Sequence, residues 1–191
     1  MNKPLFLFVG KSASGKSTIA NLLEQKYGYK QVQSYTTRPP RYDGEPGHIF
    51  VTKEEFGNLG ELAAYTLYNG NEYGTTFQQL EECDIYVIDV PGVETLLQKD
   101  KIKRAICVIY FDTTVRTRIN RMVERGASDM EIVSRLYNDE EYDWEKKLDS
   151  LIWHYTKIDN KDVELNLVNA NDNKESVLEL VLYYMRRYVE D

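Results

Sequence analysis

The most constraining feature of the sequence is a glycine-rich stretch, GKSASGKST, that begins at Gly10 directly after an apolar run at residues 5–9. Its spacing of Gly10, four residues, Gly15, Lys16 and Ser17 fits the P-loop pattern in full. A chance glycine-rich turn is the alternative, but an apolar run precedes this stretch and the helical pattern KSTIANLLEQKYG follows it. The sequence therefore predicts a loop that binds the phosphates of a nucleoside triphosphate.

Each residue type in this loop has a physical role in holding phosphates. Glycines let backbone N–H groups curl around an anion, and the helix that follows aims its positive end at it. Lys16 can reach the outer phosphates, and the Ser17 hydroxyl can ligate Mg²⁺, which we expect as the cofactor. The residues expected to bind the triphosphate are Gly10, Ser12, Ala13, Ser14, Gly15, Lys16, Ser17 and Thr18.

The hydrophobic pattern along the chain predicts an α/β fold. Apolar runs at 5–9, 85–88, 105–111 and 165–168 are typical of buried parallel strands. Helical periodicity occurs at 16–27, 93–99, 115–125, 130–151 and 176–189. We expect a P-loop nucleoside triphosphatase fold, with a mostly parallel central sheet flanked by helices. Residues 34–82, rich in Gly, Thr and Tyr, predict a small β-rich insertion.

Length and composition exclude several classes of protein. A chain of 191 residues is expected to form a single domain, and its net charge of −7 argues against a nucleic-acid-binding surface. Cys83 and Cys107 form no CxxC pair, and His48 and His154 are the only histidines, so we expect no zinc cluster and a reducing, cytoplasmic location. The N-terminal apolar run is too short to span a membrane, and we expect no export signal and no membrane partner.

The stretch SYTTRPPRYDGEPGHIF, at residues 34–50, predicts an anion site. It sets Arg38 and Arg41 on either side of Pro39 and Pro40. The prolines restrict the backbone, so the guanidinium groups are held in a nearly fixed relation. Planar guanidinium forks match the oxygens of a phosphate or a carboxylate, which makes a doubly charged anion the expected ligand.

Asp89 closes the apolar stretch DIYVID. An acidic residue is expected near the metal of a P-loop protein, at the tip of a strand beside the first. Asp89 is equally suited to cap a helix, because Pro91 follows at a first-turn position. The two roles are compatible, and both stay open.

Taken in order, the P-loop, SYTTRPPR, NEYGTT, VIDVPGV and RMVERG followed by Arg135 and Leu136 resemble the guanylate kinase family over most of the chain. The resemblance implies an enzyme that transfers a phosphoryl group from Mg·ATP to a nucleoside monophosphate, with GMP or dGMP as the leading acceptor. It implies a core at 1–33, 83–115 and 150–191, a monophosphate-binding region at 34–82 and a lid at about 116–149. We expect a monomer or homodimer.

The same resemblance implies roles for single residues. Arg38 and Arg41 match the arginines that hold the acceptor phosphate, and Tyr73 matches a tyrosine that bonds the same phosphate; a tyrosine packed on a strand is its alternative. Asn169, in LNLVNAND, falls in the loop that passes near the adenine. The residues expected to bind the acceptor are Ser34, Arg38, Arg41, His48, Tyr73, Thr75 and Asp89.

Arginines recur in VRTRINRMVERG. Arg121 and Arg125 share a helix face, and Arg135 returns about three turns later. The resemblance implies a mobile lid that supplies positive charge to the transferring group. The alternative is a solvated helix face, which we favour for Arg116 and Arg118, and the run NDEEYDWEKKLD is likewise expected to be a charged helix surface. The residues expected to act in catalysis are Lys16, Arg38, Arg121, Arg125 and Arg135.

The base-reading positions depart from the family pattern. The family's guanine-reading glutamate falls at Ala64, whose methyl group accepts no hydrogen bond from guanine. Glu61 lies three residues away and would need a shift in strand register. A second phosphate tyrosine of the family falls at His48, which either bonds the phosphate with partial charge near neutral pH or stands at a strand end. Ser34 matches a base-contacting residue, and Thr75 and Thr76 match nearby hydroxyls.

Three alternatives remain at this stage. Ala64 leaves room for a kinase acting on a different nucleotide or phosphorylated acceptor. A non-catalytic binding module of guanylate-kinase type is disfavoured by the intact P-loop. An ATPase or regulator with the same fold would hydrolyse ATP without any monophosphate.

Overall fold

The core of the protein is a parallel sheet. In the computed structural model, which describes residues 3–140, 144–157 and 162–190, the strands β1 (Leu5–Val9), β6 (Ile85–Val87), β7 (Ile106–Asp112) and β8 (Val163–Asn169) follow the order β6-β1-β7-β8. All three pairings are parallel. Parallel strands buried on both faces need apolar residues throughout, which is why β1 and β7 were visible as apolar runs, whereas the edge strand β8 alternates buried and exposed residues. The predicted α/β fold is confirmed.

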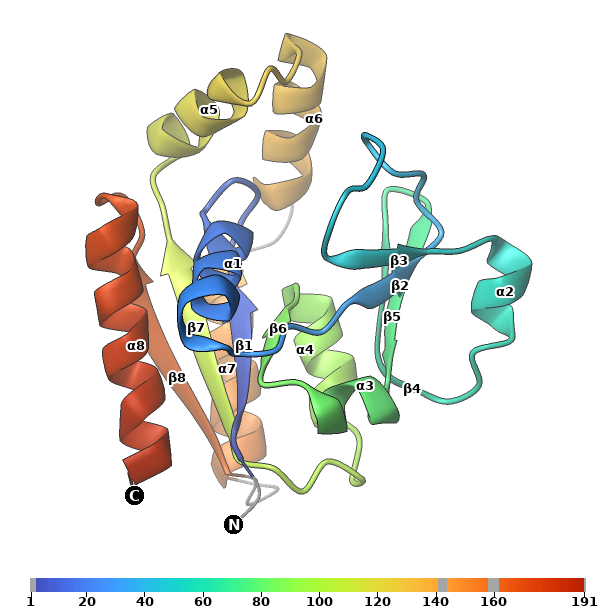
Figure 1. Ribbon diagram of the computed structural model, residues 1–191, viewed down its shortest axis with the longest axis vertical. Helices are drawn as coiled ribbons and strands as arrows, with labels where there is room; N and C mark the ends of the chain where they lie inside the picture. The colour runs from blue at the N-terminus through green and yellow to red at the C-terminus, as the bar shows by residue number, and fades with distance from the viewer. Residues whose placement is uncertain (1–2, 141–143, 158–161, 191) are drawn as a thin grey trace.

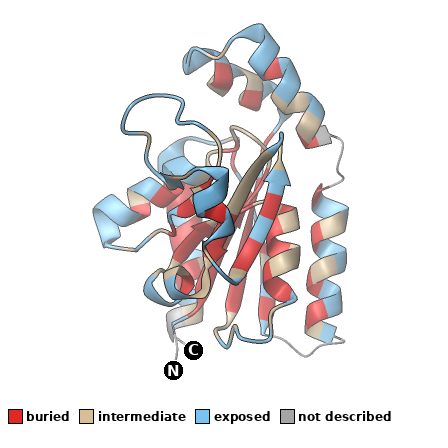
Figure 2. Cartoon of the chain, turned by 90° about the vertical axis from the view of Figure 1, so that its right-hand side faces the viewer, coloured by how far each residue is buried: buried red, intermediate tan, exposed pale blue. Residues whose placement is uncertain are grey.

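Helices cover both faces of this sheet. Phe6 and Phe8 point toward α1 (Lys16–Tyr27) and α8 (Lys174–Glu190), whereas Leu5, Leu7 and Val9 pack with α4 (Val90–Leu97) and α7 (Trp144–Lys157). The alternation follows from the two-residue period of a strand. Figure 2 shows the buried positions gathered along the sheet and on the helix faces that meet it. Among the described residues, no helix is long and apolar enough to cross a membrane.

A second sheet forms the β-rich insertion. Its strands β2 (Ser34–Thr36), β3 (His48–Phe50), β4 (Leu62–Tyr68) and β5 (Asn71–Thr76) follow the order β3-β2-β5-β4, and the short helices α2 (Lys53–Gly57) and α3 (Phe77–Glu82) flank it. β4 packs against α4, with Ala63 and Ala64 in the same apolar cluster as Val93 and Leu96. This packing sets the second sheet beside the first (Figure 1).

Two helices lie above the carboxyl ends of the central strands. These are α5 (Val115–Glu124) and α6 (Asp129–Glu140). The expected single helix at 130–151 is wrong: α6 ends at Glu140 and α7 begins at Trp144 in a different place, against the sheet; residues 141–143 lie outside the described residues. The physical reason is that Trp144, Leu148 and Ile152 bury one face of α7, while α6 leaves Met130, Val133 and Tyr137 exposed.

Candidate active site

The P-loop connects β1 to α1 in a conformation that its glycines make accessible. Gly10 has φ +150°, and a Cβ there would lie 2.8 Å from the carbonyl oxygen of Phe111 on the neighbouring strand. Gly15, with φ +102°, is the N-cap residue of α1 and offers no capping side chain. Ala13 also adopts a left-handed conformation, with φ +60°. The helix start is therefore left with free N–H groups, which suits an anion.

Lys16 lies folded over this loop. Its Nζ donates to the carbonyl oxygens of Gly10 and Lys11, the latter at 2.9 Å, and to the Ser14 hydroxyl at 3.2 Å. Burial lowers the pKa of Lys16 to about 8, and the nearby carboxylate of Asp139 opposes that shift. Ser17 and Thr18 follow in the first turn of α1, where both are exposed.

Arg38 and Arg41 converge on one carboxylate, that of Glu45. Arg38 makes a two-pronged pair with it, at 2.9 and 3.1 Å, and Arg41 donates to it through its backbone N–H at 2.7 Å and its Nη1 at 3.0 Å. Phe50 packs under the Arg38 guanidinium, 5.3 Å from its ring centre. Burial alone would raise the pKa of Glu45, but hydrogen bonds from Arg38 and Arg41 hold it below its ordinary value. Both arginines thus converge on one internal carboxylate, and their binding of a phosphate ligand stays a prediction.

One cavity of about 200 Å³ joins the P-loop to these arginines. It is lined by Gly10, Ser12 and Lys16 from the P-loop, by Arg38, Arg41, His48, Tyr68 and Tyr73 from the second sheet and its loop, by Val87, Ile88 and Asp89 from β6 and the start of α4, and by Asp139 and Trp144 from α6 and α7. Residues up to 134 positions apart in the sequence, Gly10 and Trp144, therefore meet in one space.

His48 lines this cavity, and Ser34 is buried beside it without lining the cavity. His48 is the first residue of β3, and its Nδ1 lies 2.9 Å from the Ser34 hydroxyl. Its ring centre is 5.7 Å from that of Tyr73. Burial and the charge of Arg38 lower the pKa of His48, which favours the neutral ring over the partial charge expected from the sequence.

Of the base-reading positions, Glu61 lies out of register, as the sequence indicated, whereas Thr75 departs from the expectation. Glu61 is half exposed and pairs with Lys99 and Lys101 on the surface, so it does not take the place of the missing glutamate at Ala64. Thr75 pairs with Ala64 across β4 and β5, is fully buried, and donates its hydroxyl to Gln79 at 2.9 Å. Thr75 therefore does not line the cavity, and we leave it out of the proposed acceptor site.

Asp89 serves as a helix cap and also faces the cavity. Its Oδ1 accepts from the backbone N–H of Gly92 at 2.8 Å, which caps α4, and from the Thr66 hydroxyl at 2.7 Å. Burial raises the pKa of Asp89, and these hydrogen bonds oppose the shift. The capping role left open by the sequence is thus observed, and one carboxylate oxygen ties β4 to α4 at the edge of the cavity. Thr66 was not among the expected site residues.

The three arginines expected in a lid lie at different places, Arg121 and Arg125 at α5 and Arg135 on α6. Arg121 donates to the carbonyl oxygens of Ser14, at 3.0 Å, and Ala170, at 2.7 Å. Arg125 ends α5 and is exposed, and its charge contributes to lowering the pKa of Lys16 after the larger effect of burial. Arg135, on α6, acts in the same way on Arg41. None of the three is among the residues that line the cavity, and Arg121 contacts the P-loop directly, through the carbonyl oxygen of Ser14.

The largest difference from the sequence expectation is the burial of Arg118. It was expected on a solvated face, but it is fully buried and pairs with Asp139, itself 2% exposed. Asp139 belongs to the run expected as a charged surface. Arg116, by contrast, is exposed as expected. Asn169 ends β8, accepts from Asn171 and does not line the cavity.

Sequence reasoning also missed Glu45. Glu45 lies four residues after Arg41, and this spacing of an acidic residue from an arginine could have predicted their ion pair. Asp139 gave no such signal, because its partners Ser12 and Arg118 lie 127 and 21 residues away.

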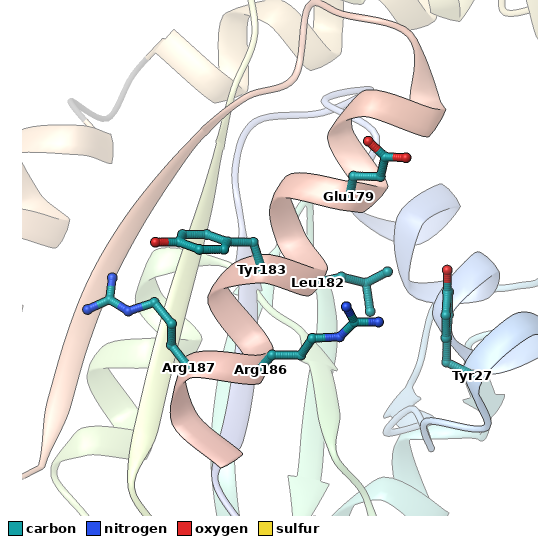
Figure 3. A pocket seen from close by; sticks show the side chains of 6 residues that line it. All are labelled: Tyr27, Glu179, Leu182, Tyr183, Arg186 and Arg187. Carbon is teal, nitrogen blue, oxygen red and sulfur yellow. The ribbon is translucent and has the colours of Figure 1, made fainter. Parts of the chain in front are cut away.

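A larger hollow, of about 620 Å³, lies between α8 and the end of α1 (Figure 3). Leu182 and Arg186 point across it toward Tyr27, while Tyr183 and Arg187 point to the other side of α8. None of its lining residues belongs to the phosphate-binding motifs. We therefore place the functional site at the smaller cavity beside the P-loop.

A P-loop that faces a pair of anion-holding arginines across a cavity defines the class of protein: a P-loop phosphotransferase of the nucleoside monophosphate kinase type. The guanylate kinase family model matches residues 1–170, and the chain belongs to this family.

Curated relatives and a solved structure agree with this assignment. The chain is 32% identical to a guanylate kinase of Oceanobacillus iheyensis over 142 residues, covering 68% of each chain. It is 30% identical to one of Fusobacterium nucleatum, covering 78% of this chain and 86% of the relative. The chain also matches a crystal structure of guanylate kinase from Anaplasma phagocytophilum, with a TM-score of 0.56 and 21% identity. The match covers 97% of this chain and 85% of the chain in that structure, which shows that the two share a fold.

Proposed function

We propose that this enzyme transfers the γ-phosphoryl group of Mg·ATP to the phosphate of GMP or dGMP, giving ADP and GDP or dGDP. The observation that carries the proposal is the single cavity that holds Lys16 and the Arg38–Arg41 pair. Family membership supports the same reaction.

The donor is assigned to the P-loop side. Lys16 and the free N–H groups at the start of α1 would hold the β- and γ-phosphates. The donor set suits Mg²⁺, which keeps several waters and takes one or two protein oxygens. The Ser17 hydroxyl would hold this ion, with the Asp89 carboxylate facing the same cavity. When bound, Mg²⁺ neutralises charge that builds on the phosphate oxygens.

The acceptor is assigned to the arginine side. The guanidinium groups of Arg38 and Arg41 would bind the monophosphate together with the Tyr73 hydroxyl. Among the described residues, Nε of Arg38 is buried and has no acceptor, so this arginine has a donor left for a phosphate oxygen. A monophosphate is largely a dianion at pH 7, so its oxygen needs no base before it attacks the γ-phosphorus. The new P–O bond forms as the bond to the β-phosphate oxygen breaks, and ADP leaves.

The transferring group gains charge that Arg121, Arg125 and Arg135 would stabilise. The contact of Arg121 with the P-loop and the charge effects of Arg125 on Lys16 and of Arg135 on Arg41 support this role, and we propose that the region at about 116–149 acts as a lid over the core while residues 34–82 bind the acceptor. The monomeric or homodimeric state stays a prediction.

The environment of Ala64 is the one observation behind a second candidate, a kinase for another nucleotide, which the family comparisons do not favour. Ala64 is buried in the apolar cluster and Glu61 is engaged on the surface, so neither supplies a carboxylate to guanine. In the first candidate, Ser34, backbone groups and the neutral ring of His48 must read the base.

The test is ADP formation from Mg·ATP with GMP, dGMP, AMP, CMP, UMP and dTMP offered separately, beside a control without acceptor and a K16M control. Turnover stimulated only by GMP or dGMP is the expected result. Stimulation by another monophosphate would support the second candidate, and turnover that ignores every acceptor would identify an ATPase.

A further inference from the structure

A buried ion pair encloses one residue of the P-loop. Arg118, on α5, donates from Nε to the carbonyl oxygen of Ser12 at 2.9 Å and from Nη2 to the carboxylate of Asp139. Asp139, on α6, accepts from the backbone N–H of Ser12 at 2.9 Å and from its hydroxyl at 3.2 Å. The N–H, the carbonyl oxygen and the hydroxyl of Ser12 are therefore all held by one ion pair.

Stability alone gives a weak account of this pair. Taking two charges out of water costs free energy that their attraction only partly offsets, and apolar replacements of a buried pair are often neutral or stabilising. Arg118 is fully buried and Asp139 is 2% exposed, so the full cost applies here. An apolar pair would make no hydrogen bonds to the backbone N–H and carbonyl oxygen of Ser12.

One member of the pair, Asp139, also lines the cavity. Ser12, Asp139 and Lys16 line the same cavity, so the carboxylate lies among the groups that would meet the donor phosphates. A P-loop binds phosphates through backbone N–H groups, and its affinity depends on how these groups are aimed. Holding Ser12 by both of its peptide groups restricts the loop at its second residue after Gly10.

α6 is tied to the acceptor side through the residue before Asp139. Asn138 donates from Nδ2 to the Oδ1 of Asn69, in the turn between β4 and β5, at 2.9 Å. Arg135 lies four residues before Asp139 and so shares its helix face. Anchoring Asp139 at the P-loop therefore also sets where Arg135 stands relative to the acceptor arginines.

We propose that Arg118 and Asp139 are positioning residues for phosphoryl transfer, which fix the P-loop at Ser12 and anchor α6, with Arg135, over the cavity. The proposal rests on the proposed function of the same site. Neither residue is assigned a contact with the reacting atoms.

The main test replaces both charges at once, as R118M/D139V, because the combined volume is similar and no charge is left unpaired. The matched control is K147M/E94Q, which removes a partly exposed ion pair of 2.9 Å between α7 and α4 that does not line the cavity. We expect kcat/KM for ATP to fall about 10- to 100-fold in R118M/D139V. The thermal midpoint and the Kd for GMP should stay at the values of the control. A kcat/KM for ATP equal to that of the control overturns the proposal.

The variant R118K covers the case in which the double variant does not fold. Lysine keeps the charge but lacks the planar fork that reaches Ser12 and Asp139 together. We expect it to fold and to lose at least about threefold in kcat/KM for ATP, a modest part of the loss expected for the double variant. Wild-type values of both kcat and KM in R118K would overturn the proposal in that case.

Failure of the proposed function is distinguishable from failure of this inference. If the wild type phosphorylates neither GMP nor dGMP, the function is refuted, and the positioning role is then judged by the Kd for ADP, measured by calorimetry without any acceptor. A weaker ADP affinity in R118M/D139V than in K147M/E94Q supports the role, and equal affinities refute it.

Discussion

Arg38 and Glu45 meet fork to fork, with Nη2 to Oε1 at 2.9 Å and Nη1 to Oε2 at 3.1 Å. The same carboxylate accepts a hydrogen bond from the Nη1 of Arg41 at 3.0 Å, so a single carboxylate already positions both guanidinium groups. Such preorganisation lowers the cost of arranging the arginines around an acceptor phosphate.

Removing one of these arginines should weaken acceptor binding selectively. R41M loses a charged hydrogen bond to the phosphate, worth about 1.5–3 kcal/mol, and the KM and Kd for GMP should rise about 10- to 150-fold with little change in the KM for ATP. Calorimetry and initial rates measure both. R116M is the control, because Arg116 is exposed on α5. An R41M enzyme with the wild-type Kd for GMP would remove Arg41 from the acceptor site.

Lys16 should be needed for turnover and not for folding. Its burial disfavours the charged form, so K16M should keep or raise the free energy of unfolding while turnover falls about 100-fold or more. Denaturant titration measures the free energy of unfolding, and the ADP assay measures turnover. Near-normal turnover in K16M would refute the assigned role.

The pH profile of the free enzyme should follow Lys16. Its pKa is lowered to about 8 by burial, so the cation that binds phosphate is present below that pH and is lost as the pH rises through it. We expect kcat/KM for ATP to fall above about pH 8. At saturating ATP the phosphate charges favour the protonated amine, so kcat should stay level to higher pH. A flat kcat/KM profile up to pH 9.5 would contradict this assignment.

The capping and site roles of Asp89 can be separated with serine. D89S keeps a good N-cap for α4, whereas D89A should cost about 0.5–2 kcal/mol of unfolding free energy through the lost cap. We expect D89S to be close to wild type in urea unfolding, yet to need more Mg²⁺ for half-maximal turnover. If the Mg²⁺ dependence of D89S matches wild type, Asp89 acts as a cap alone.

Glu61 should be irrelevant to base choice. It pairs with Lys99 and Lys101 on the surface and does not line the cavity. E61Q should leave the order of preference among the acceptors unchanged and cost at most about 1 kcal/mol of stability. Initial rates with GMP and AMP are sufficient. A changed ratio of their kcat/KM values would show that β4 shifts register when an acceptor binds.

Local sequence patterns were sufficient for the P-loop and its surroundings. The strand at Leu5–Val9, the glycines at their left-handed positions and the helix at Lys16–Tyr27 are contiguous, and each is set by the residues that form it. The two prolines likewise restrict the backbone between Arg38 and Arg41, while Glu45 and Phe50 hold the guanidinium groups. The apolar runs predicted the α/β class for the same reason, because strands buried on both faces must be apolar.

What only the tertiary structure decided is which charges are buried and which residues meet. Helical periodicity places Arg118 on a face of α5 but does not say that a carboxylate from α6 will cover it. Ser12 and Asp139 are 127 residues apart, and the cavity that they share with Lys16 and Arg41 exists only once both sheets are packed. The sequence by itself determined the chemistry of the phosphate-binding elements, since that depends on local backbone geometry. The long-range pairing of charges depends on the packing of distant elements, and that was settled by the tertiary structure alone.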